Sequence, residues 1–195
     1  MPTILTEKDY PVSVLFDFEK GDFSPKEKTV ERHVSDLSMM FDDQDAVDAA
    51  IEQGDPIIYE IFYHGFETSL SDMALGVTRI QPGKIGNEFY MTKGHFHAAE
   101  DQPEIYFCVK GNGYLLMEAK SGEFRAEEWK PGVISHIPPM WAHRVVNIGD
   151  EPLVFVASYH LAAGHDYEPV IEKGFQKRVV EKNGEAVFIE NEQRG

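Results

Sequence analysis

The stretch TKGHFHAAEDQPEIYFCVKGNG, residues 92–113, places two histidines one residue apart and a glutamate at the start of the next apolar run. In an extended strand alternate side chains face the same way, so His95 and His97 project from one face with Cα atoms about 7 Å apart. Two imidazoles at that separation can converge on one metal ion. Glu104 opens a run whose two faces are both mostly apolar, and a carboxylate there is costly unless it is paired or ligates an ion.

A fourth candidate ligand lies farther along the chain. In PGVISHIPPMWAHRVVNIG, His143 follows a Pro-Pro corner on what we predict to be a return strand. Three neutral imidazoles and one carboxylate suit a first-row divalent ion and leave a position open for water or substrate. A histidine pair alone is more often two ordinary strand residues, but the combination of four is a stronger signal. The other histidines have no such partners and are predicted to be surface or hydrogen-bonded residues: His33, His64, His136 and His160.

The composition indicates one compact domain over residues 1–195, because a chain of 195 residues with 42% hydrophobic content can bury a sizeable core. The formal net charge of −16 disfavours nucleic acids and anionic membranes as partners, since either would repel such a surface. An anionic small substrate would therefore need a local positive site.

The cysteine content and the N-terminus bear on the compartment. One cysteine, Cys108, excludes an intramolecular disulfide and fits a reducing compartment, so we expect the cytoplasm. On its strand this residue is predicted to be an inert, buried core thiol. Residues 1–22 lack a basic region followed by a long apolar run, and no window approaches the roughly 20 apolar residues of a spanning helix. We therefore expect neither a signal peptide nor a membrane anchor.

The N-terminal part of the chain is predicted to be helical and extended. Residues 42–53 combine acidic residues at the start, alanines inside, and Gly54 and Pro56 as a stop, which predicts a short helix. Residues 1–40 alternate short apolar stretches with charge, so we expect extended segments and loops there. These residues would form an N-terminal extension, residues 1–55, that packs on the body of the domain.

From residue 56 onward the pattern changes to runs of β-branched and aromatic residues that recur about every 8–12 positions. Turn residues separate the runs, among them Gly111-Asn112-Gly113, Pro131-Gly132 and an Asn183-Gly184 hairpin near the end. This spacing is typical of an antiparallel barrel or sandwich. We predict an all-β body over residues 56–190.

Two motifs in this body resemble those of the cupin superfamily. The first covers residues 94–111, with six residues between the second histidine and the glutamate, where many cupins have three or four. The second covers residues 132–147, with Gly-x5-Pro followed by His-x3-Asn. Met140 stands where the general pattern of this second motif has glycine.

Longer segments narrow the resemblance. TKGHFH, EIYFCVKGNG, PPMWAHRVVNIGDEP and AGHDYEPVIEKGF together resemble the cupin-type phosphoglucose isomerases, and the similarity runs from about Tyr59 to Gly174. The resemblance implies a cupin jelly-roll β-barrel that carries the helical and extended N-terminal segment and assembles as a homodimer. It also implies one divalent transition metal per subunit, for which we expect Fe²⁺ first, with Mn²⁺, Ni²⁺, Co²⁺ and Zn²⁺ as alternatives.

The resemblance also implies the site residues. The metal ligands would be His95, His97, Glu104 and His143. The substrate phosphate would contact Thr78, Thr92, Tyr159 and the backbone of Gly94. The sugar end would be lined by Tyr59, Tyr106 and His165. Hydroxyls and a glycine N–H are good phosphate donors, while phenols and an imidazole can bond sugar hydroxyls or move protons. Without the family, the tyrosines fit core packing as well as a pocket, and the first threonine fits simple strand propensity.

The implied activity is the interconversion of glucose 6-phosphate and fructose 6-phosphate. A metal on O1 and O2 of the open-chain sugar would polarise the carbonyl, and Glu104 would carry a proton between C1 and C2 through an enediol. A ligated carboxylate is a weaker base, so a hydride shift in which Glu104 is only a ligand is the alternative.

Two further functions stay open at this point. A cupin with three histidines and one carboxylate can be an iron or manganese dioxygenase, which oxygen consumption would reveal. It can also be a non-catalytic sugar-phosphate-binding module. Cupins carry many chemistries, so the fold alone does not choose among these functions.

Overall fold

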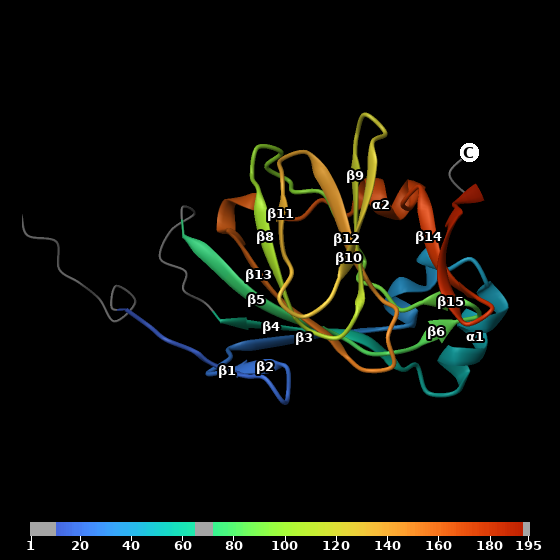
Figure 1. Ribbon diagram of the computed structural model, residues 1–195, viewed down its shortest axis with the longest axis horizontal. Coiled ribbons are helices and arrows are strands. Elements are labelled where there is room, and N and C mark those ends of the chain that lie inside the picture. The colour runs from blue at the N-terminus through green and yellow to red at the C-terminus, as the bar shows by residue number, and fades with distance from the viewer. Residues whose placement is uncertain (1–10, 65–71, 193–195) are drawn as a thin grey trace, which may run out of the picture.

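The structure is a computed structural model that describes residues 11–64 and 72–192, and two β-sheets facing each other form its centre (Figure 1). The larger sheet has the order β11-β8-β13-β5-β4-β3 and the smaller one β10-β9-β12. The strands of the larger sheet are β3 (Lys28–His33), β4 (Ile57–His64), β5 (Met73–Ile80), β8 (Glu104–Lys110), β11 (Ile134–Ile137) and β13 (Leu153–His160). Those of the smaller sheet are β9 (Gly113–Ala119), β10 (Phe124–Trp129) and β12 (Trp141–Asn147). The fold is all-β and cupin-like, as predicted, although the described strands do not hydrogen-bond into a closed barrel.

Alternation of side chains explains how the two sheets pack. On β8 one face is buried, with Glu104, Tyr106 and Cys108 pointing inward. The indole of Trp129 from the smaller sheet lies edge-on to the rings of Tyr106 and Phe155 from the larger one, with centroid separations of 5.9 and 5.4 Å. Cys108 is fully buried in this core, and its burial raises the pKa of the thiol to about 11. The predicted buried thiol is confirmed.

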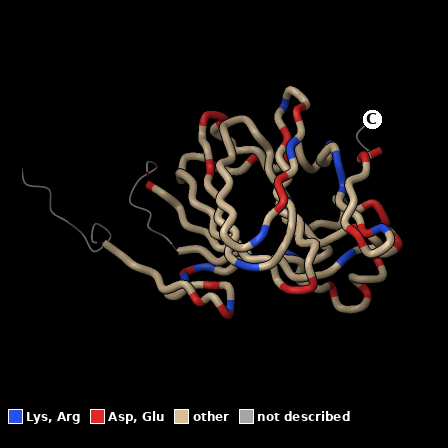
Figure 2. Tube along the Cα trace, in the orientation of Figure 1, with Lys and Arg blue, Asp and Glu red and all other residues tan. Residues whose placement is uncertain are grey.

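Two further sheets cover the outside. The strands β14 (Lys177–Lys182) and β15 (Glu185–Glu190) form a hairpin that joins β7 (Glu88–Phe89) and β6 (Lys84–Ile85). Tyr114 of β9 packs against Phe188 of this hairpin, with centroids 4.8 Å apart. The hairpin of β1 (Leu15–Asp17) and β2 (Asp22–Ser24) covers the outer face of β4, β5 and β13 with Phe23. Most charged residues lie on turns and outer strands (Figure 2).

The N-terminal region confirms part of its prediction. The helix expected over residues 42–53 is α1 (Gln44–Glu52), and the carboxylate of Asp43 caps it by accepting a hydrogen bond from the N–H of Ala46 at 2.9 Å. A 3₁₀ helix, η2 (Ser35–Met40), precedes it and was not predicted. The expected extended segments are present from residue 11 onward, while those expected over residues 1–10 lie outside the described residues.

The C-terminal part holds two further short elements that the sequence did not predict. They are η3 (Leu161–Ala163) and α2 (Glu168–Lys173), the latter with proline in its first turn and Gly174 after its end. No helix in the described part of the chain is long and apolar enough to cross a membrane.

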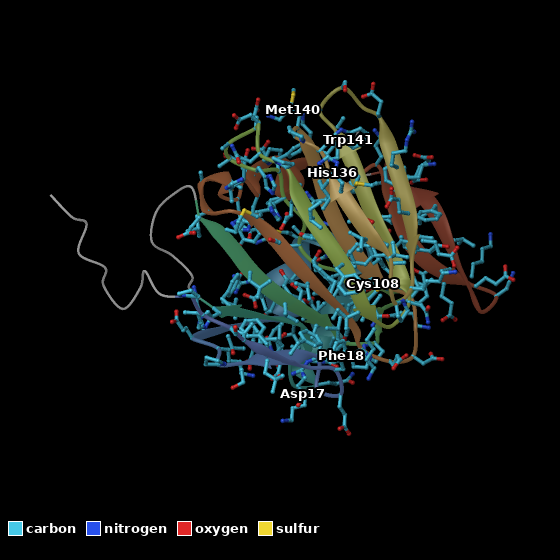
Figure 3. All side chains as sticks on the ribbon, turned by 60° about the vertical axis from the view of Figure 1, so that its left-hand side comes forward. Asp17, Phe18, Cys108, His136, Met140 and Trp141 are labelled. Atoms are coloured by element: carbon cyan, nitrogen blue, oxygen red, sulfur yellow. The ribbon has the colours of Figure 1, made fainter. Side chains whose placement is uncertain are left out.

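The turns fall where the sequence places them. Asn183 and Gly184 both have positive φ, 56° and 82°, and join β14 to β15 as the predicted two-residue hairpin. Met140 has φ 71° at the corner between β11 and β12, where the cupin pattern has glycine (Figure 3). The corner therefore keeps a left-handed backbone although it carries an L side chain, which strains that residue.

The substitution Met140→Gly is expected to stabilise the fold by about 1 kcal/mol, because it relieves a left-handed conformation that costs an L residue roughly 1–2 kcal/mol. The side chain is 54% exposed, so little packing is lost. Urea unfolding followed by circular dichroism measures the change. Met140→Ala removes the same side chain but keeps the strain and should give no gain. Equal stability changes in the two variants would contradict this account.

Candidate active site

Three segments bring the predicted ligands together. His95 and His97 lie in the loop before β8, Glu104 begins β8, and His143 lies on β12. One ligand atom from each of the four lies within 4.8 Å of those of the others. Glu104, His97 and His143 are almost fully buried. Such a group could hold a divalent metal ion.

The histidine rings are oriented through their second nitrogen. Nδ1 of His97 lies 2.7 Å from the carbonyl oxygen of Gln102, and Nδ1 of His143 lies 3.2 Å from that of Trp141. Nδ1–H is therefore the donor in both rings, and this bond turns Nε2 toward the group. Nε2 of His95 is buried without a hydrogen-bond partner among the described residues. This unpartnered nitrogen fits a metal ion.

The carboxylate and the rings shift one another's protonation. Glu104 Oε2 lies 3.2 Å from Nε2 of His97 and 3.0 Å from Nε2 of His143. Burial opposes ionisation of Glu104, but these two imidazoles outweigh it and hold the pKa of Glu104 below its ordinary value. Burial likewise opposes protonation of His97, but Glu104 and the carbonyl of Gln102 raise the pKa of His97. Burial holds the pKa of His95 well below its ordinary range. A divalent cation would thus replace the proton shared by His97 and Glu104.

Strand β12 holds the loop that carries the histidine pair. His95 and His143 exchange two backbone hydrogen bonds of 3.3 and 3.1 Å. The N–H of Thr92 donates to the carbonyl of Val145 at 2.9 Å, and the N–H of Val145 donates to Thr92 Oγ1 at 3.1 Å. The hydroxyl of Thr92 thereby keeps its own proton for a ligand. Gly94 has φ 74°, and a Cβ there would come within 3.0 Å of the carbonyl oxygen of His143, so the loop requires glycine.

The other predicted site residues line an inner cavity of ≈ 60 Å³ beside the histidine group. Antiparallel register explains why they share one face: Tyr159 pairs with Glu104, and Phe155 pairs with Thr78. All predicted site residues except His97 line this cavity: Tyr59, Thr78, Thr92, Gly94, His95, Glu104, Tyr106, His143, Tyr159 and His165.

Burial also fixes the protonation of the aromatic residues at the cavity. It raises the pKa of Tyr59 to about 12 and that of Tyr106 well above its ordinary value. Both phenols are therefore hydrogen-bond donors at neutral pH. Burial lowers the pKa of His165, whose ring centroid lies 4.4 Å from that of His95. A neutral imidazole can accept one proton and donate another.

Several residues at the mouth were missed in the sequence. An outer cavity of ≈ 440 Å³ shares much of its lining with the inner one, including Lys93 and Tyr167. The ring of Tyr167 stacks on His165, and the ammonium of Lys93 lies 5.5 Å from the centre of the Tyr167 ring. Lys28 and Arg32 of β3 also line the outer cavity. Lys93 could have been predicted as a site residue, because it lies between the predicted phosphate contacts Thr92 and Gly94. Lys28 and Arg32 could not, because only the pairing of β3 with β4 brings them to the cavity.

Comparison with known proteins decides the family. The family model for glucose-6-phosphate isomerase (GPI) matches residues 31–194. The chain belongs to this family. It is 45% identical over 181 residues to the glucose-6-phosphate isomerase of Thermococcus litoralis and 42% identical to that of Pyrococcus furiosus, in each case over 93% of this chain and 95% of the relative. The resemblance to cupin-type phosphoglucose isomerases, and the enzyme class it predicts, are thereby confirmed.

A more distant likeness exists among solved structures. Oxalate decarboxylase of Bacillus subtilis matches with a TM-score of 0.44 and 25% identity, over 52% of this chain and 26% of that one. It is too distant to support an argument about the site.

Protein loaded with Fe²⁺, Mn²⁺ or Zn²⁺ and then gel-filtered is expected to carry one ion per chain, measured by inductively coupled plasma mass spectrometry. Loss of one ligand, in His143→Ala or Glu104→Gln, should weaken binding by at least roughly 10–100-fold, the loss known for residues that only support ligands. His136→Ala removes an exposed histidine of β11 outside the group and should bind normally (Figure 3). Full metal content in both ligand variants would exclude this centre.

Proposed function

We propose that the chain is a metal-dependent aldose-ketose isomerase that interconverts glucose 6-phosphate and fructose 6-phosphate. The observation that carries the proposal is the buried group of three histidines and Glu104, which opens on a cavity lined by hydroxyl groups in a member of this family. We further propose that one divalent ion is held there, with Fe²⁺ as the first candidate. A single domain acting in the cytoplasm, in glycolysis and gluconeogenesis, completes the proposal.

The phosphate of the substrate would bind at the wall formed by Thr92, Thr78 and Tyr159. Thr92 Oγ1 already accepts a hydrogen bond from the N–H of Val145, so its own proton is free for a phosphate oxygen. Gly94 lets a ligand approach the backbone closely. Lys93, Lys28 and Arg32 at the outer cavity supply the positive site that an acidic protein needs in order to attract an anion.

The chemistry would then take place beside Glu104. A divalent cation supplies Lewis-acid polarisation of the sugar carbonyl when it is bound. The pKa of Glu104 is lowered, so this carboxyl group is ionised at neutral pH. Both of its imidazole contacts use Oε2, which leaves Oε1 for the substrate. From fructose 6-phosphate, this carboxylate would take a proton from C1 and return it at C2 of the enediol. A proton must also move from O1 to O2, and neutral His165 with the phenols of Tyr59 and Tyr106 would bond these oxygens.

The isomerase assay tests the proposal directly. Protein stripped with a chelator should be inactive, and activity should return with a single divalent metal, followed as glucose 6-phosphate formed from fructose 6-phosphate in a coupled assay. The rate should be equal under air and under argon. No activity with every metal, in protein shown to bind one, would reject the proposal. Oxygen consumption with organic acids would then favour a dioxygenase.

Isotope exchange tests the role of Glu104. In D₂O, isomerisation by proton transfer should place solvent deuterium at C2 of glucose 6-phosphate, detected by proton NMR. Glu104→Gln at full metal occupancy should lower kcat by roughly 10²–10⁴-fold, the usual contribution of a general base. Complete retention of the original hydrogen would instead support a hydride shift in which Glu104 serves only as a ligand.

We also propose a homodimer that pairs the uncovered part of the larger sheet. On the outer face of β8 and β11, Phe107 pairs directly with Ile134, and Ile105 lies two residues along. These side chains are 38%, 67% and 42% exposed, although the β1–β2 hairpin covers other strands of the same face. A contiguous apolar patch on a sheet face is typical of an interaction site.

Light scattering coupled to gel filtration should give the mass of two chains for the native protein and of one chain for Phe107→Lys, because a lysine cannot be buried unpaired in the interface. Metal content should be unchanged in this variant. Ile189→Lys changes an apolar residue of similar exposure on β15 and should remain dimeric. A dimeric Phe107→Lys protein would place the interface elsewhere.

A further inference from the structure

A separate polar cavity of ≈ 210 Å³ lies on the outer side of β12, between α2, β14 and η2. Four cationic side chains line it, and the one acidic residue in the lining is Glu172. The cations are Arg144, Lys173, Lys177 and Arg178. β14 carries Lys177 and Arg178, and these two are paired with Glu190 and Glu88 at 2.9 Å each (Figure 2). Arg144 and Lys173 form no ion pair among the described residues. None of the residues predicted to hold the substrate or the metal lines this cavity.

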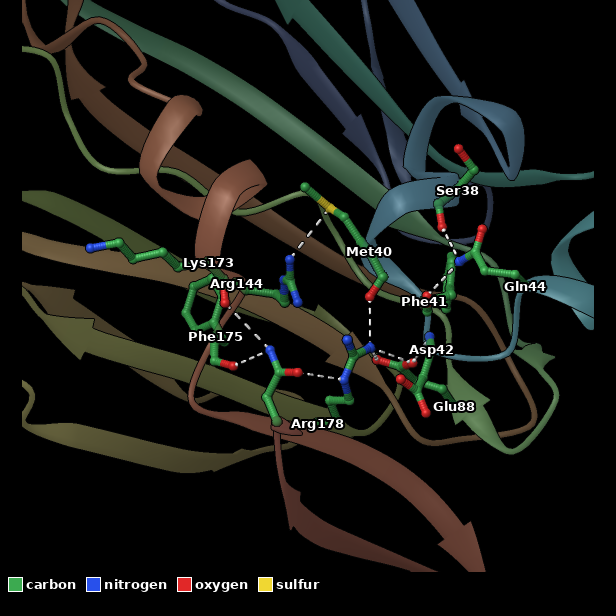
Figure 4. Close-up of polar contacts among 11 residues, drawn as sticks. Ser38, Met40, Phe41, Asp42, Gln44, Glu88, Arg144, Lys173, Phe175 and Arg178 are labelled. Atoms are coloured by element: carbon green, nitrogen blue, oxygen red, sulfur yellow. Dashed lines mark hydrogen bonds and ion pairs between the residues drawn. The ribbon is translucent and has the colours of Figure 1, made fainter. Parts of the chain in front are cut away.

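Arg144 is the central group of this cavity. It is 4% exposed and directly follows His143 on β12. Its Nη2 donates to the carbonyl oxygen of Lys93 at 2.8 Å. It also lies 3.4 Å from the sulfur of Met40, and the guanidinium lies 4.6 Å from the centre of the Phe175 ring (Figure 4). Its Nε is buried and has no acceptor among the described residues. A buried guanidinium N–H without an acceptor is costly and rare.

The nearby carboxylate Glu88 attracts Arg144 but gives its Nε no acceptor. Glu88 accepts two hydrogen bonds from Arg178 Nη1, at 2.9 and 3.1 Å, and one from the N–H of Asp42 at 3.2 Å (Figure 4). The buried carboxylates Glu88 and Glu118 both attract the charge of Arg144 and oppose the lowering of its pKa by burial, but Glu88 is paired with Arg178. Arg144 has no ion pair within the part of the chain that the structure describes.

We propose that this cavity is a second anion site, in which Arg144 Nε and the lysines around it bind a small oxyanion of the phosphate class. Arginine and lysine are the side chains that best match phosphate oxygens. An anion here would give the buried Nε–H of Arg144 the acceptor that it lacks among the described residues. The site is distinct from the one at Thr92, because β12 separates the two.

An anion bound in this cavity would affect the expected binding site of the substrate phosphate. The same guanidinium that borders the cavity donates to the carbonyl of Lys93, which lies between Thr92 and Gly94. An occupant that draws on Arg144 therefore acts on the loop expected to hold the substrate phosphate. This coupling rests on the proposed function, whereas the anion site itself does not.

Titration calorimetry of the metal-loaded native protein with inorganic phosphate tests the site. Two runs are compared, one without sugar phosphate and one with a saturating equilibrium mixture of glucose 6-phosphate and fructose 6-phosphate. The sugar phosphates should displace phosphate from the first site and leave one phosphate bound per chain. If the isomerase proposal fails, they displace nothing, but the cavity site is still detected through its variants.

Two sets of variants locate the binding. Lys173→Gln combined with Lys177→Gln should weaken the persistent phosphate roughly 5–25-fold, since one exposed ion pair contributes up to about a factor of five. The matched control combines Lys130→Gln with Lys182→Gln, which removes equal charge from exposed lysines outside the cavity lining and should leave binding unchanged. Arg144→Met should weaken binding more than roughly tenfold. If Arg144→Met does not fold, the double lysine variant and its control decide alone.

Crystals soaked in sodium selenate provide the position. An anomalous selenium peak within hydrogen-bond distance of Arg144 Nε is expected. The proposal is overturned if no phosphate persists beside the sugar phosphates, or if the double lysine variant binds as well as its control. A selenate peak in the cavity without phosphate binding in solution would mark an adventitious ion only, and would overturn it too.

Discussion

The rest of the structure depends on one constraint, the burial of three imidazoles and one carboxylate in a single group. One ligand atom from each lies within 4.8 Å of those of the others. Such a group is unfavourable unless its members share protons or an ion. It therefore requires backbone that does not move. The two hydrogen bonds between His95 and His143 fix the loop to β12, and the carbonyls of Gln102 and Trp141 fix two of the rings. Glu104 is placed as the first residue of a strand whose alternation points it inward.

Strand β12 serves two sides of the molecule with successive residues. His143 faces the space between the sheets, whereas Arg144 belongs to the polar network on the outside. That network also contains Arg178, whose guanidinium donates to the carbonyl of Met40 and to Glu88 (Figure 4). The N-terminal extension, the C-terminal hairpin and the loop with the histidine pair are thus joined behind the cavity that they enclose. Burial raises the pKa of Glu88, and the charges of Arg178 and Arg144 oppose that shift.

The sequence predicted the elements that depend on local pattern. Recurring runs of β-branched and aromatic residues identified the all-β body from residue 56 onward, and Asn183-Gly184 identified its hairpin because few residues tolerate positive φ. α2 was missed because six residues with a proline in the first turn carry too short a periodic signal. The left-handed backbone at Met140 could not be predicted, because methionine rarely adopts a positive φ.

The candidate site likewise contains residues that local spacing predicts and residues that only tertiary pairing brings together. The histidine pair and Glu104 could be found because strand geometry converts their spacing into convergence. Arg32 reaches the outer cavity because β3 pairs with β4 in a register that sets it opposite Tyr59. A register between strands so far apart is a tertiary property that one chain's local pattern does not contain. Arg144 was missed for a similar reason, since its partners come from Met40 and Phe175.

The single thiol gives the molecule an internal reporter of its own opening. Cys108 has no exposed surface and lies between the two sheets, on the strand that carries Glu104 and Tyr106. A thiol whose pKa is raised to about 11 forms almost no thiolate at neutral pH, and reagents cannot reach it while the sheets remain packed. Its alkylation rate therefore follows the separation of the sheets rather than fraying at the surface. Because Cys108 is inert while the core is packed, its rate of alkylation measures how often the core opens.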